Sequence, residues 1–69
     1  MKEFSLEGRP HVDLCDLLKL TKLCESGGEA KHIIAEGKVQ VDGSIELRKR
    51  AKILKGQVVE YKGVKVKVV

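Results

Sequence analysis

The spacing of apolar residues changes at Gly37, and this change is the strongest constraint on the fold. Before this glycine, Ala30, Ile33 and Ile34 recur at the spacing of one buried helix face. After it, apolar and polar residues alternate, which is typical of a half-buried β-strand. Glycine itself suits the position that follows a helix C-terminus. A chain of 69 residues has room for one domain, so we expect a single α+β domain over residues 1–69.

Ser26 predicts where this helix begins. The segment Ser26-Gly27-Gly28-Glu29 has the spacing of a capping box, in which the serine caps the helix and the glutamate reaches back to the serine N–H. Each glycine in the first turn costs about 1 kcal/mol relative to alanine. The pair would be explained by close packing of this turn against a preceding helix, or by the approach of a phosphate to the backbone N–H groups. We favour packing, although both can hold together.

A shorter helix is predicted upstream. Asp13 occupies an N-cap position, and an apolar stripe of helical period follows it and ends near residues 20–22. The stripe consists of Leu14, Leu17, Leu18 and Thr21. Residues 3–6 alternate polar and apolar before a break at Gly8 and Pro10, and this pattern predicts a short edge strand.

Two hairpins are predicted after the second helix. Asp42-Gly43 is a strong signal for a type I′ turn, and Lys62-Gly63 marks a second turn between strands at residues 58–61 and 64–68. In the first hairpin, the side chains expected to face the core are Val39, Val41, Ile45 and Leu47. Those expected to face outward are Lys38, Gln40 and Glu46. The whole pattern predicts two short helices packed on a small, mostly antiparallel sheet.

Charge is unevenly distributed along the chain. Residues 1–30 carry four basic and six acidic side chains, whereas residues 31–69 carry ten basic and four acidic ones. Such a split indicates a face that attracts polyanions, although a solvated surface is the other interpretation. Phe4 and Tyr61 are the only aromatic residues. Two aromatics cannot supply a base-stacking platform, so a nucleic acid would be bound through backbone shape and charge.

Several classes of protein are disfavoured. No apolar run could cross a membrane, and no nucleophile-and-base spacing or phosphate-binding glycine loop suggests an enzyme. We expect a cytoplasmic protein with reduced thiols. The conceivable zinc ligands are Cys15, Cys24, His11 and His32, but they include no C-x-x-C pair. Structural cysteines and surface histidines are the preferred interpretation, so we expect no catalytic residue, no metal and no cofactor.

The order of these features resembles a known family. A helix, a turn, a capped helix, a glycine and a hairpin around Asp-Gly make up the αL motif of the RNA-binding domain named after small-subunit ribosomal protein four. In that family, S-x-x-x-A-x-x-x-I-x-x-G leads into V-x-V-N-G. The matching residues here are Ser26, Ala30, Ile34, Gly37, Val39, Val41 and Gly43. The resemblance covers about residues 13–56 and is greatest to the small stand-alone bacterial members, the YbcJ/YaaA-type proteins.

This resemblance implies a monomeric, non-enzymatic domain that binds structured RNA, ribosomal or transfer RNA. The family often has arginine where this chain has Gly27 and Asp13, and asparagine where it has Asp42. The electrostatic role therefore falls on other cations. The residues expected to contact RNA are Lys31, Lys38, Arg48, Lys49, Arg50 and Lys52, with Ser26, Gly27 and Gly28 at the helix N-terminus.

Two other functions fit parts of the pattern. Residues 57–69 end in strand sequence, and an open strand edge there would suit a small protein-interaction adaptor. Charge alone does not distinguish RNA from double-stranded DNA, although no helix rich in Arg, Asn or Gln is visible for the major groove. RNA binding is the interpretation that also accounts for the order of helices, glycine and hairpin.

Overall fold

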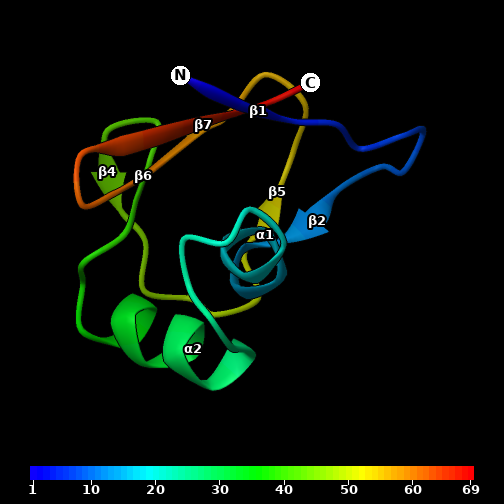
Figure 1. Ribbon diagram of the computed structural model, residues 1–69. Helices are drawn as coiled ribbons and strands as arrows, with labels where there is room; N and C mark the ends of the chain where they lie inside the picture. The colour runs from blue at the N-terminus through cyan, green and yellow to red at the C-terminus, as the bar shows by residue number, and fades with distance from the viewer.

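The computed structural model describes all 69 residues and contains two helices and seven short strands (Figure 1). The helices are α1 (Leu14–Leu20) and α2 (Gly27–Ala35). The strands are β1 (Lys2–Phe4), β2 (Val12–Asp13), β3 (Gln40–Val41), β4 (Ser44–Ile45), β5 (Lys52–Ile53), β6 (Val58–Tyr61) and β7 (Val64–Val68). The chain is therefore an α+β protein, and the predicted class is confirmed.

Five strands form the main sheet, in the order β1-β7-β6-β3-β4. Neighbouring strands are antiparallel except β1 and β7, which run parallel. The prediction of a mostly antiparallel sheet with β1 at an edge is thus confirmed. A separate antiparallel pair is formed by β2 and β5. In Figure 1 both helices lie on the same side of the main sheet, and the N-terminal strand β1 lies beside the C-terminal strand β7.

One hydrophobic core joins the helices to the sheet. It contains 17 buried residues and no buried polar side chain. The helical stripes contribute Leu14, Leu17, Leu18, Ala30, Ile33 and Ile34, and the strands contribute Val59, Tyr61, Val66 and Val68. The predicted helical faces are therefore the buried ones. Neither helix is long and apolar enough to cross a membrane.

The first hairpin turns where predicted, but its second strand faces the opposite way. Asp42-Gly43 forms the turn with φ angles of 51° and 84°, so Val41 pairs with Ser44. Paired residues share a face of the sheet, and side chains alternate along each strand. Ile45 and Leu47 therefore lie on the face opposite to Val41. The prediction that they face the core is wrong, since each is 60% exposed.

The start of α1 is capped differently from the prediction. Asp13 occupies the N-cap position, but its side chain makes no capping hydrogen bond. The N–H of Leu14 donates to the carbonyl of Ala51 at 2.9 Å, and the N–H of Cys15 donates to the carbonyl of Lys49 at 3.0 Å. A backbone segment distant in the chain therefore satisfies two of the N–H groups that a helix start leaves without an intrahelical partner.

The C-terminal strands lie inside the sheet. The second hairpin forms around Lys62-Gly63 as predicted, but β6 lies between β3 and β7, and β7 lies between β1 and β6. Adding a partner strand requires a free edge, and β6 and β7 have none. The adaptor interpretation based on residues 57–69 therefore loses its structural basis.

Candidate nucleic-acid interface

The N-terminus of α2 presents two unbonded backbone donors. Ser26 Oγ accepts a hydrogen bond from the N–H of Glu29 at 3.1 Å, as the capping box predicts. Glu29 Oε1 accepts from the N–H of Glu25 at 2.7 Å, one residue further back than predicted. The N–H groups of Gly27 and Gly28 make no hydrogen bond. At the positive end of the helix dipole, these two donors can bind an anion.

Packing does not require the two glycines. A Cβ atom placed on Gly27 would meet nothing within 4 Å, and one placed on Gly28 would meet only Ser26 Oγ, at 3.9 Å. Neither glycine has a positive φ. Close packing against the preceding helix, the explanation favoured from the sequence, is therefore wrong. Steric packing therefore does not account for the loss of helix propensity, about 1 kcal/mol for each glycine.

The basic run (residues 48–52, Arg-Lys-Arg-Ala-Lys) is attached to the start of α1. Its carbonyls at Lys49 and Ala51 accept the first two N–H groups of that helix. Lys52 pairs with Asp13 in the ladder between β5 and β2. Ala51 is buried, whereas the four cationic residues of the run are exposed. The backbone of the run is thus held in place while its cations remain in solvent. Because the backbone is already fixed, less conformational entropy is lost when these cations bind a ligand.

Arg48 differs from the other cations of the basic run because Glu46 binds its guanidinium. Nε and Nη2 of Arg48 donate to the two carboxylate oxygens of Glu46 at 3.0 and 3.2 Å, and the Arg48 backbone N–H donates to the same carboxylate at 3.0 Å. The side-chain hydrogen bonds from Arg48 lower the pKa of Glu46 below its ordinary value, and the same contact raises the pKa of Arg48.

Sequence reasoning missed this role of Glu46, which was expected only to face outward. A two-residue turn places residue 46 on the face of Val41, where the Glu46 side chain is 19% exposed. Counting residues from the turn would have shown its facing, but not its contact with Arg48. Because the ion pair is open to solvent on the Arg48 side, a phosphate can compete with the carboxylate for the guanidinium.

Lys31 lies in the middle of α2, and Lys38 lies beyond its C-terminal end. Lys31 is exposed on the helix, whereas Lys38 follows Gly37 after the helix has ended. Gly37 has a φ of 76°, and the N–H groups of Gly37 and Lys38 donate back into the last turn, which completes the predicted helix end. The Nζ atom of Lys38 lies 3.2 Å from Glu36. The predicted cations without an ion pair are Lys31, Lys49, Arg50 and Lys52.

Cys15 and Cys24 are free thiols buried in the core. Burial raises the pKa of the Cys24 thiol, and the charge of Glu29 acts in the same direction. A raised pKa decreases the thiolate fraction at neutral pH and with it the reactivity of the thiol. No group of three His, Cys, Asp or Glu residues is arranged to hold a metal ion.

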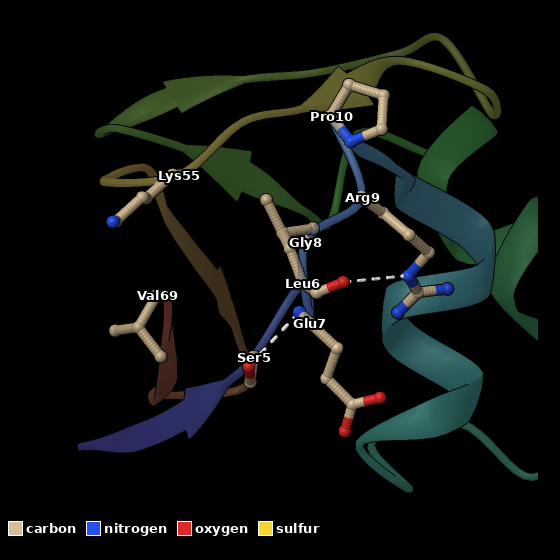
Figure 2. Close-up of a pocket in the computed structure, with 8 residues that line it drawn as sticks. All are labelled: Ser5, Leu6, Glu7, Gly8, Arg9, Pro10, Lys55 and Val69. Carbon is tan, nitrogen blue, oxygen red and sulfur yellow. Dashed lines mark hydrogen bonds between the residues drawn. The ribbon is translucent and has the colours of Figure 1, made fainter.

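A surface hollow lies apart from these residues, beside the loop that follows β1 (Figure 2). It is lined by Ser5, Leu6, Glu7, Gly8, Arg9, Pro10, Lys55 and Val69. Arg9 Nε donates to the carbonyl of Leu6 at 3.0 Å, and its guanidinium lies 5.8 Å from the centroid of the Phe4 ring. None of the residues predicted to contact RNA lines this hollow.

The family follows from a comparison of the whole chain with known domains. Residues 4–69 match the model of the S4 domain. The chain belongs to the S4 domain family. The match begins at the last residue of β1 and includes the C-terminal hairpin in addition to the helices and the first hairpin. The family resemblance inferred from the helix–glycine–hairpin order is confirmed.

This S4 domain is similar along its whole length to two bacterial proteins. It is 58% identical to the YbcJ proteins of Escherichia coli (strain K12) and Shigella flexneri, over 100% of this chain and 99% of each relative. The solution structure of YbcJ from E. coli matches with a TM-score of 0.77 and 58% identity, over 100% of this chain and 87% of that chain. That structure is described as revealing an αL motif involved in RNA binding. The αL fold is confirmed for this chain.

Proposed function

We propose that this S4 domain binds structured RNA without catalysing a reaction. The bound surface consists of α2, the β3–β4 hairpin and the basic run. The contact residues are Ser26, Gly27, Gly28, Lys31, Lys38, Arg48, Lys49, Arg50 and Lys52. The protein acts in the cytoplasm as a monomer, and its target is ribosomal or transfer RNA. The αL motif of the E. coli relative, described as involved in RNA binding, supports the class of ligand.

The attachment of the basic run to α1 is the observation that carries this proposal. Lys49, Arg50 and Lys52 are exposed and form no ion pair, so their charges are available to a ligand. Their backbone is fixed by hydrogen bonds to the helix start. A fixed group of cations suits a ligand whose phosphates are also fixed in space, as they are in a folded RNA helix.

The two aromatic residues support structured rather than single-stranded RNA as the ligand. Tyr61 is 7% exposed, and Phe4 is half-buried against the core. Neither presents a free ring face on which successive bases could stack. Recognition by this domain therefore relies on the phosphate backbone and the shape of the RNA.

Charge reversal in the basic run tests the proposed surface. Lys49→Glu with Arg50→Glu should abolish binding to a labelled RNA hairpin, measured by fluorescence anisotropy, while leaving thermal unfolding unchanged because both side chains are exposed. Arg48 is kept, because a glutamate there would face Glu46. The matched control is Lys19→Glu with Lys55→Glu, which changes the net charge equally at exposed positions outside the proposed surface and should retain most of the affinity.

Equal losses in the two double variants would indicate general attraction and contradict the assigned surface. Salt dependence gives a second test. Four to six phosphate contacts predict a slope of about −3 to −5 in a plot of log affinity against log salt concentration. Raising salt from about 50 to about 200 mM should therefore weaken binding well over tenfold. A flat response would exclude the proposed electrostatic surface.

A further inference from the structure

Ile45 and Leu47 form an exposed apolar surface beside the end of α2. A methyl group placed on Gly37 would lie 3.6 Å from Ile45 Cγ2 and 3.7 Å from Leu47 Cδ2, so both side chains converge on the bare backbone of this glycine. Each is 60% exposed, the largest exposed fraction among the apolar residues after Met1. We call Gly37, Ile45 and Leu47 the aliphatic shelf.

The fold gains little from these two apolar side chains. They project from β4 and the residues that follow it, at the edge of the main sheet, and the core contains neither of them. Exposed apolar residues on a free strand edge favour unwanted association, and proteins usually avoid them. Threonine, which is also β-branched, would serve the strand at the position of Ile45. A ligand that covers the shelf would account for the apolar choice.

The surroundings of the shelf favour an anionic ligand. Lys38 follows Gly37 in the chain and Arg48 follows Leu47, each in an ion pair with a glutamate, and the cations Lys49 and Arg50, which form no ion pair, come directly after Arg48. The basic run begins at the same Arg48. The shelf is also small. A stable protein interface buries about 800 Å² on each partner, more than two aliphatic side chains supply, whereas one nucleobase has a face of matching size.

We propose that the aliphatic shelf packs against one unstacked nucleobase, in a bulge or loop next to the RNA helix whose phosphates contact the basic run. This inference rests on the proposed function and adds a base-binding position to it. The contact is apolar and involves the face of the base, so it should tolerate any base, as stacking contacts do. This contact would allow a protein without exposed aromatic rings to prefer RNA with a bulge or loop over a continuous duplex.

The test compares two RNA hairpins that differ by one bulged nucleotide in the stem. The wild-type protein should bind the bulged hairpin about fivefold more tightly, the lower end of the effect known for side chains that stack on a base. Ile45→Ser with Leu47→Ser should remove this preference and leave the affinity for the paired hairpin unchanged. Leu20→Ser with Leu54→Ser is the matched control, because these leucines are similarly exposed, at 55% and 51%, and it should keep the preference.

Each alternative outcome has a distinct meaning. If the wild-type protein binds both hairpins equally, or if the shelf variant weakens both equally, the shelf proposal is overturned while RNA binding stands. If the wild-type protein binds neither hairpin, the proposed function fails as well. A shelf variant with unchanged RNA affinities but a smaller particle size by light scattering would assign the shelf to a protein contact and overturn the proposal. Circular dichroism of every variant shows whether the fold is intact.

Discussion

Asp42 and Val58 are joined by two hydrogen bonds. The N–H of Asp42 donates to the carbonyl of Val58 at 2.8 Å, and the N–H of Val58 donates to Asp42 Oδ1 at 2.9 Å. Asp42 Oδ2 also accepts from Gln57 Nε2 at 3.1 Å. The carboxylate that replaces the family's asparagine therefore connects the β3–β4 turn to the start of β6, and its charge serves contacts within the domain.

Asp42→Ala should destabilise the domain by about 1 to 2 kcal/mol, because it removes a charged acceptor from a position with a left-handed φ of 51°. Urea unfolding followed by circular dichroism measures this loss. Asp42→Asn is the control, since asparagine keeps an oxygen for Val58 and tolerates the left-handed conformation. It should lose less than half as much stability, and an alanine variant as stable as wild type would contradict the proposed connection.

Gly28→Ala should stabilise the domain and weaken RNA binding at the same time. No atom obstructs the new methyl group, so the gain in helix propensity, about 0.5 to 1 kcal/mol, should appear in full. The same methyl group would hinder a phosphate from approaching the N–H groups of the first turn. Thermal unfolding and fluorescence anisotropy measure the two effects.

Ala35→Gly, at the other end of α2, is the control for Gly28→Ala. It should lower stability and leave the RNA affinity unchanged, because Ala35 is exposed and lies far from the first turn. If Gly28→Ala binds RNA as tightly as wild type does, the two glycines are not needed for a phosphate contact.

Glu46→Gln should strengthen RNA binding by freeing the guanidinium of Arg48. A neutral amide competes less well than a carboxylate for this group, so Arg48 can fork onto phosphate oxygens. The salt slope should become steeper by up to about 0.9, the value of one added contact. Glu3→Gln changes the net charge equally on an exposed residue of β1 that has no ion pair. An equal gain in both variants would mean that only the net charge matters.

The Glu46 carboxylate also gives a pH dependence of known sign. Hydrogen bonds from Arg48 lower its pKa in the folded state from the ordinary 4.5. Because the pKa of Glu46 is lower in the folded protein than in the unfolded chain, its ionised form stabilises the fold. This stabilisation is complete above the unfolded pKa and is lost as the pH falls through the folded pKa. This contribution should therefore be constant at neutral pH and disappear only below the ordinary value. In a carboxyl NMR titration, Glu46 should titrate lower in wild type than in Arg48→Gln, and equal midpoints would refute the contact.

The facing of β4 was within reach of the sequence and was nevertheless predicted wrongly. Asp42-Gly43 correctly indicated a two-residue turn, and such a turn places Val41 opposite Ser44. Alternation then requires Ile45 and Leu47 to lie on the other face. Apolar character suggested burial instead. The turn decides the outcome because strand pairing fixes the face of the sheet on which each side chain lies. The apolar character of Ile45 and Leu47 does not change that pairing.

The sequence by itself determined the elements whose causes are local. The helix from Ser26 to Gly37 follows from a cap, an apolar period and a glycine that tolerates a left-handed conformation, and both tight turns follow from a glycine, Gly43 or Gly63, that accepts positive φ. Only the tertiary structure decided which carbonyls cap α1. The capping groups at Lys49 and Ala51 come from a segment distant in the chain, so no local pattern of residues records them. The Glu46–Arg48 contact, between residues two apart, is local by comparison.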